Sequence, residues 1–249
     1  MSFRRIHKNA RSALAVLIAV ATHSVLALSD ANSWSSDKEP SSLRNPVSFI
    51  DSERKNQLED IYLRSHEAME QGKIGLGVWL LHQAAEGGYV LAMHDLALQL
   101  RSGTIIPRDY AGAARWYRRA AEWGGTGFAG SQNNLGDMYE NGQGVQKSSA
   151  DAVYWYTRAA LQGEPTAYLS LGICFADGIG VAKDTVEGYF WLSLAVENLH
   201  EGSNRTLARR KLHALEKWLL PEQVEAAITK VKAYRPYIQT QYTIGDPFE

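Results

Sequence analysis

Four segments of the chain share one pattern of apolar positions, which is that of a helix with a single apolar face. In each segment, apolar or small residues fall at i, i+3, i+4, i+7 and i+8. The second of these positions is Leu80, Trp116, Trp155 and Trp191 in turn. Leu80 lies 36 residues before Trp116, and the three Trp residues lie 39 and 36 residues apart. A helical pattern that returns at a nearly constant spacing predicts an array of repeats.

A second predicted helix precedes each Trp-bearing helix, with apolar or small residues at i, i+4 and i+8. Its copies begin their pattern at Ala92, Ser131 and Ala167. In the last two copies, Gly142-Gln143-Gly144-Val145 and Gly178-Ile179-Gly180-Val181 separate the two helices. Good N-cap residues also recur in one column before the Trp-bearing helix, namely Asp109, Ser148 and Asp184. Pattern, caps and stops agree on a helix–turn–helix repeat.

This combination resembles the Sel1-like repeat family, a relative of the tetratricopeptide repeats. The family signature stands here as Leu135-Gly136, Tyr139, Gly142-Gln143-Gly144-Val145, Trp155-Tyr156 and Ala159-Ala160. The resemblance covers about residues 75–200, although Gly103-Thr104-Ile105-Ile106 departs from it in the first copy. It implies an all-α fold, a right-handed α-solenoid of about four repeats within residues 49–235. The residues expected to have structural roles in the repeats are Trp116, Trp155, Trp191, Gly142, Gly144, Gly178 and Gly180.

The repeat register is lost after Glu201. Residues 206–220 and 221–234 predict two further helices, which we expect to cap the apolar end of the array. The first of them is rich in basic residues, which form either a solvated face or a weak patch for an acidic partner. These are Arg205, Arg209, Arg210 and Lys211. Residues 236–249 are expected to form a flexible tail.

The N-terminal segment has the three parts of a secretory signal peptide. Four basic residues come first, residues 13–21 form an unbroken apolar run, and Val25-Leu26-Ala27 suits cleavage after Ala27. We therefore expect an exported protein with no transmembrane span after cleavage. A periplasmic location is favoured, with secretion and the endoplasmic-reticulum lumen as alternatives, and a transit peptide or an uncleaved anchor also stay open. The Ser-rich residues 28–48 predict a disordered linker.

Charge and composition exclude several classes of function. The chain has 26 basic and 27 acidic residues, and removing residues 1–27 leaves 22 against 27, a net charge of −5. Such a chain does not attract nucleic acid. Its lone Cys174 falls on an apolar helix face and predicts a buried core thiol. The motif at 125–130 spells a dinucleotide fingerprint but follows a predicted helix instead of a strand, so we expect no cofactor. The histidines show no ligand spacing, so we expect no metal site.

Candidate partner-binding residues fall into two groups. Trp123 breaks a column that otherwise holds Gly87, Gln162 and Asn198, and it adjoins the insertion that carries Phe128. The two rings either anchor a partner or fold together as a local staple. The second group comprises polar residues on the first helices, which line a binding groove or form plain solvated surface: His94, Asn133, Asn134 and Asp137.

The function that these observations favour is binding without catalysis. We expect a scaffold, adaptor or regulator of the cell envelope whose groove holds protein or peptide segments, possible envelope components among them. One alternative is a glycan- or peptidoglycan-associated accessory protein or hydrolase, which would need an acid pair about 5–10 Å apart in a deep cleft. Another is a secreted factor that interacts with a host.

Overall fold

The computed structural model describes residues 52–236, and these residues form ten α-helices and no strand. The predicted signal peptide, the predicted linker and residues 237–249 of the predicted tail lie outside the described residues. The helices are α2 (Ser52–Glu70), α3 (Ile74–Gly87), α4 (Val90–Ser102), α5 (Tyr110–Ala121), α6 (Ala129–Asn141), α7 (Ser149–Leu161), α8 (Pro165–Asp177), α9 (Thr185–Asn198), α10 (Ser203–Glu216) and α11 (Pro221–Ala233).

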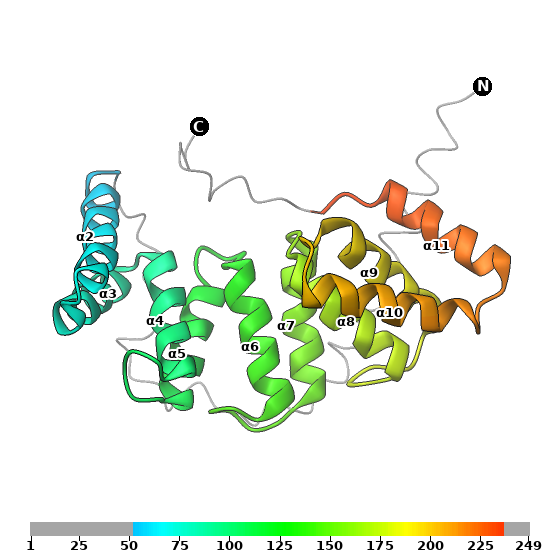
Figure 1. Cartoon of the computed structure of the whole chain (residues 1–249), viewed down its shortest axis with the longest axis horizontal. Coiled ribbons are helices and arrows are strands. Elements are labelled where there is room, and N and C mark those ends of the chain that lie inside the picture. Colours follow the sequence, from blue (N-terminus) through cyan, green and yellow to red (C-terminus); the bar gives the residue numbers. More distant parts are fainter. Residues whose placement is uncertain (1–51, 237–249) are drawn as a thin grey trace. The chain divides into compact units, whose positions relative to one another are not determined.

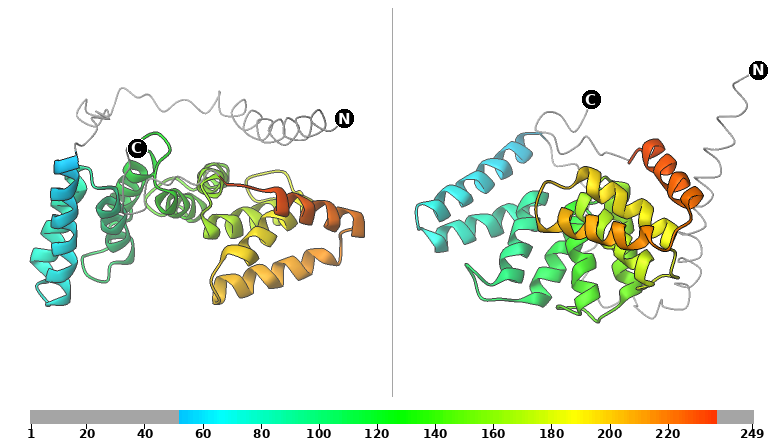
Figure 2. Two further views of the ribbon diagram at one scale, coloured as in Figure 1. Left: turned by 90° about the horizontal axis from the view of Figure 1, so that it is seen from above. Right: turned by 45° about the vertical axis from the view of Figure 1, so that its right-hand side comes forward.

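Consecutive helices form antiparallel pairs, and each pair packs on the next (Figure 1). The pairs are α2–α3, α4–α5, α6–α7 and α8–α9, and the further views in Figure 2 show the same order. Both α10 and α11 pack on α9. The prediction of an all-α solenoid with C-terminal capping helices is confirmed, although α10 ends at Glu216, four residues before the predicted end.

The core is continuous along the array because some side chains bridge its apolar clusters. Trp116 and Leu100 contact both the cluster of α3–α5 and that of α4–α7. Tyr139 then contacts the latter cluster and that of α7–α11. Trp155 and Trp191 are buried, with exposed fractions of 6% and 4%. Each hairpin therefore buries its apolar face against its neighbours, as in a repeat protein.

Side-chain caps and left-handed glycines set the ends of the helices. Asp109 accepts a hydrogen bond from Gly112 N–H, Ser148 from Asp151 N–H, and Asp184 from two N–H groups at the start of α9. These contacts satisfy amides that lack partners within the helix. Gly142 and Gly178 end α6 and α8 with φ of +69° and +76°.

The second glycine of each loop has a different task, which is to allow close approach between repeats. Gly144 and Gly180 also have positive φ, +70° and +72°. A Cβ on Gly144 would lie 2.1 Å from the carbonyl oxygen of Tyr110, and one on Gly180 would lie 2.2 Å from that of Ser149. Each loop thus seats against the beginning of the Trp-bearing helix of the preceding repeat.

Candidate functional site

The candidate site is the surface formed by α4, α6 and the residues just before α8, here called the first-helix surface. Helices α4 and α6 occupy the same place in successive repeats, so residues 39 positions apart in the sequence correspond. His94 corresponds to Asn133 in this way, and Leu98 to Asp137. Leu98 is 43% exposed and adds an apolar side chain to this otherwise polar surface.

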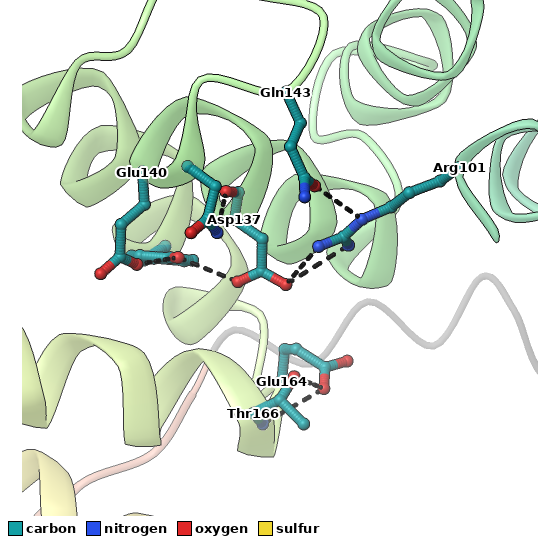
Figure 3. Close-up of polar contacts among 8 residues, drawn as sticks. Arg101, Asp137, Glu140, Gln143, Glu164 and Thr166 are labelled. Atoms are coloured by element: carbon teal, nitrogen blue, oxygen red, sulfur yellow. Dashed lines mark hydrogen bonds and ion pairs between the residues drawn. The ribbon is translucent and has the colours of Figure 1, made fainter. Parts of the chain in front are cut away.

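Asp137 is the centre of a polar network on this surface (Figure 3). One of its carboxylate oxygens accepts a hydrogen bond from the Tyr156 hydroxyl at 2.9 Å. The other lies 3.4 and 3.5 Å from the two terminal nitrogens of Arg101, whose Nε donates to Gln143 at 3.3 Å. Burial raises the pKa of the Asp137 carboxyl, and the Tyr156 hydrogen bond and the Arg101 charge oppose that rise. The network joins α4 to the next repeat.

Tyr156 also lies 2.7 Å from a carboxylate oxygen of Glu140, so its hydroxyl stands between two acids. Burial and the two nearby carboxylates raise the pKa of Tyr156, which therefore stays protonated. The phenol has a single O–H proton, so it donates a hydrogen bond to only one of the two carboxylates at a time. The hydroxyl of the buried Tyr156 side chain thus bridges the two carboxylates.

His94, on α4, also contacts α6, near the N-terminal end of that helix. Its Nδ1 lies 2.9 Å from the Ser131 hydroxyl, and its ring makes an edge contact with Phe128 at a centroid distance of 5.0 Å. Burial lowers the pKa of His94, and the charges of Asp95 and Glu164 oppose this shift. The imidazole is therefore mostly neutral at pH 7.

The two predicted asparagines differ in burial. Asn133 is only 7% exposed, and its Oδ1 has no hydrogen-bond partner among the described residues. Asn134 is half-buried and lies close to the hydroxyl end of Tyr117. The four predicted polar residues are thus buried or half-buried, and His94 and Asp137 bind across repeats. A role for them in partner binding stays a prediction.

Trp123 adjoins the Gly-rich insertion that carries Phe128, and both residues are half-buried. Both rings pack against the apolar cluster of α3, α4 and α5, and the Phe128 N–H donates to the Ala120 carbonyl at 2.9 Å. The structure therefore gives both rings a packing contact, and a partner contact through their exposed parts stays a prediction.

The insertion itself is held by side-chain amides. The buried Gln132 donates to the carbonyls of Ala121 and Thr126 at 2.9 and 2.6 Å. Gln162, from the following repeat, donates to the Gln132 side chain at 2.7 Å, and Arg158 donates to the Thr126 carbonyl at 3.2 Å. As predicted, the fingerprint-like stretch follows a helix, α5, instead of a strand.

Sequence reasoning missed three residues of the polar network, namely Arg101, Glu140 and the hydroxyl of Tyr156. Arg101 and Glu140 are 39 residues apart, so they occupy equivalent positions in successive repeats. An alignment of the repeats therefore shows a charged residue at this position in both. Tyr156 belongs to the Trp-Tyr motif, and the helical pattern places it on the apolar face. Its ring is indeed fully buried, but its hydroxyl reaches the first-helix surface.

Cys174 and the remaining titratable groups offer little reactive chemistry. Burial raises the pKa of the Cys174 thiol to about 12, and the side chain is 2% exposed, as expected for a core thiol. Within residues 52–236, no cluster of three or more His, Cys, Asp or Glu side chains is arranged to hold a metal ion. Over the same residues, no helix has the length and apolar character needed to cross a bilayer.

Comparison with known proteins agrees with the repeat geometry. Residues 62–89, 90–124, 129–164 and 165–198 match the Sel1 repeat. The chain is 32% identical over 107 residues to HRD3B of Arabidopsis thaliana, a component of an ERAD-associated E3 ubiquitin-protein ligase, and this match covers 42% of the chain and 16% of HRD3B.

The solved structures similar to the chain include two repeat proteins from bacteria. The first is c5321, a protective antigen of uropathogenic Escherichia coli strains with an SLR fold, at 25% identity and a TM-score of 0.60, covering 72% of this chain and 38% of c5321. The second is a Sel1 repeat protein from Oxalobacter formigenes, at 35% identity and a TM-score of 0.46, covering 54% of this chain and 95% of that protein. The Sel1 repeat fold is typically a non-enzymatic scaffold for protein binding. With four matched repeats that span more than half of its length, the chain belongs to the Sel1 repeat family.

Proposed function

We propose that this protein is a scaffold that binds an extended segment of a partner protein on its first-helix surface. The observation that carries the proposal is the polar network between successive repeats. Arg101 and Asp137 are held in place by contacts across repeats while 23% and 32% of their side chains stay exposed. Groups fixed before binding lose little side-chain entropy when a partner docks.

The chemistry of this surface suits a peptide backbone. Arg101 supplies N–H donors, and the carboxylates of Asp137, Glu140 and Glu164 supply acceptors (Figure 3). The exposed Leu98 adds an apolar contact beside them. The name of HRD3B, a ligase component, supports a role in protein assembly, although the shared stretch is a small part of that protein.

The proposal is tested by comparing two variants in affinity capture from the native source, with quantitative mass spectrometry. Arg101→Ala removes a donor of the first-helix surface. Arg115→Ala is the matched control, because this Arg lies on α5 with 74% of its side chain exposed. A partner held on the first-helix surface should be depleted with Arg101→Ala and retained with Arg115→Ala. Equal recovery with both variants would move the binding site elsewhere.

For the compartment, we propose export through residues 1–27, with the cell envelope as the site of action. The basic start, the apolar run and the small residues at 25–27 support this. A fusion of residues 1–27 to a reporter that is active only after export should give activity, and the mature protein should begin at Leu28. Glycan on Asn204, which is exposed at the start of α10 and lies in a sequon, would instead indicate the endoplasmic reticulum.

A further inference from the structure

The first-helix surface carries more acidic than basic side chains. Helices α4 and α6 together contain three acidic residues and one arginine, and Glu164 adds a fourth carboxylate just before α8. Two of these acids already have partners. A carboxylate oxygen of Asp95 lies 3.2 Å from the imidazole of His66, and one of Asp137 lies 3.4 Å from the guanidinium of Arg101. The charge of the arginine is thus used within the surface.

The other two acids, Glu140 and Glu164, form no ion pair with any residue between 52 and 236. One oxygen of Glu140 accepts a hydrogen bond from the Tyr156 hydroxyl at 2.7 Å, and one of Glu164 accepts from the Thr166 hydroxyl at 2.8 Å (Figure 3). The second oxygen of each carboxylate makes no hydrogen bond in this part of the chain, and neither oxygen is buried. Half-buried carboxylates without a cation of their own attract positive charge.

Asn133 adds an acceptor that also lacks a partner. The side chain is only 7% exposed, and its amide makes no hydrogen bond to any described residue. Its Oδ1 is buried, whereas its Nδ2 reaches solvent. A buried carbonyl without a donor costs free energy, and native proteins rarely leave one in this state. A half-turn of the amide about its last side-chain bond would present Oδ1 to a donor on the surface.

The repeat register places this amide beside the two unpaired acids. Asn133 corresponds to His94, whose imidazole contacts Tyr117, Phe128 and Ser131. The residues at the equivalent positions one repeat later are Tyr156, Glu164 and Ala167. Because Ala167 has no hydroxyl, Asn133 lacks the partner that His94 finds in Ser131. The register thus sets Asn133 between Glu164 and the Tyr156 hydroxyl, which Glu140 contacts.

We infer that the partner segment of the proposed function, on which this inference rests, carries a basic side chain that docks beside Asn133 between Glu140 and Glu164. A lysine ammonium has three N–H donors and no acceptor, and an arginine has five donors. Either group would supply donors to the two free carboxylate oxygens and to the Asn133 carbonyl. The same two carboxylates would repel an acidic segment, so the surface selects its partner by charge.

The test measures fluorescence anisotropy of labelled, end-capped peptides in which Ser alternates with Lys, with Gln or with Glu. Low ionic strength keeps the charge contribution large. Glu140→Gln and Glu164→Gln each remove a charge but keep an oxygen for Tyr156 or Thr166. Glu197→Gln is the matched control, because it removes the same charge from an exposed position on α9. Circular dichroism checks that all three variants keep their helices.

We expect the natural protein to bind the Lys peptide more tightly than the Gln peptide, and the Glu peptide most weakly. Glu140→Gln and Glu164→Gln should each weaken binding of the Lys peptide about tenfold, as loss of a charged hydrogen bond does, and Glu197→Gln should not. No preference for Lys over Gln would overturn the inference. So would equal losses in all three variants, since the attraction would then come from overall charge.

These outcomes are independent of the test of the proposed function. Capture with Arg101→Ala reports whether a partner uses the first-helix surface, whatever the charge of that partner. A partner that is lost with Arg101→Ala, together with no preference for the Lys peptide, would leave the proposed function standing and remove the basic side chain from it.

Discussion

Gly178 and Gly180 allow a direct test of what sets the spacing between repeats. Both lie in the loop between α8 and α9, with φ of +76° and +72°. They differ in the space around them. A Cβ on Gly180 would lie 2.2 Å from the Ser149 carbonyl oxygen, whereas the nearest atom to one on Gly178 is Lys183 Cβ at 3.2 Å. Replacing each by Ala thus imposes the same backbone penalty with very different steric consequences.

The magnitudes follow from these two terms. A left-handed backbone costs a residue with a Cβ about 1–2 kcal/mol relative to Gly. Gly178→Ala should therefore lower the free energy of unfolding by about 1–2 kcal/mol. At Gly180 the loop must also withdraw from the start of α7, and overpacking of this kind costs typically about 1–3 kcal/mol more. We expect Gly180→Ala to lower the free energy of unfolding by about 2–5 kcal/mol.

Urea unfolding followed by far-ultraviolet circular dichroism measures both effects. Gly124→Ala is a third variant for comparison, because Gly124 has φ of +63° and no atom lies within 4 Å of its ideal Cβ. Gly124→Ala and Gly178→Ala should cost similar amounts, and Gly180→Ala clearly more. Equal losses at Gly178 and Gly180 would refute the idea that this loop must approach the preceding repeat closely.

Four features allow further tests. Gln132→Met keeps the size of a buried side chain but removes the side-chain donor to the Ala121 carbonyl, whereas the Thr126 carbonyl still accepts from Arg158 and Gln162, so urea unfolding should show a loss of about 1–3 kcal/mol; a neutral change would contradict this role. Cys174, whose thiol pKa is raised to about 12 by burial, should resist alkylation in the native protein and react once urea unfolds it; rapid native labelling would contradict its burial. Trp123→Ala should weaken partner capture with little change in thermal stability if its ring contacts a partner, whereas a large loss of stability would assign the ring to local packing. Because burial lowers the pKa of His94, the unfolded state binds the proton more readily than the folded state. The free energy of unfolding should therefore fall as pH drops below 6.5, by at most about 1.4 kcal/mol per pH unit. His94→Gln should reduce this slope, and an unchanged slope would exclude His94 as its source.

The fold was predictable because its determinants are local and repeated. The N-caps at Asp109, Ser148 and Asp184 act as their column predicts. The left-handed conformations of Gly142 and Gly178 follow from their place after an apolar helical pattern. Such signals depend on spacings of a few residues, which a single sequence contains in full.

The polar contacts between repeats were less predictable because they depend on how the repeats stack. Arg101 reaches Asp137 across 36 positions, and Arg158 reaches Thr126 across 32. Neither distance is a fixed helical spacing, and the second depends on the path of an insertion without helical pattern. Polar residues could be assigned to the first helices from sequence, but their partners could not.

The amides that hold the insertion also bear on how such arrays diversify. Three extra residues between α5 and α6 lengthen one interval from 36 to 39, yet Gln132 and Gln162 satisfy the carbonyl that the longer loop brings inward. The change in length is thus confined to one junction, and the units on either side keep their own helix caps. Insertions accommodated in this way would let duplicated repeats diverge in loop length while their paired-helix structure stays the same.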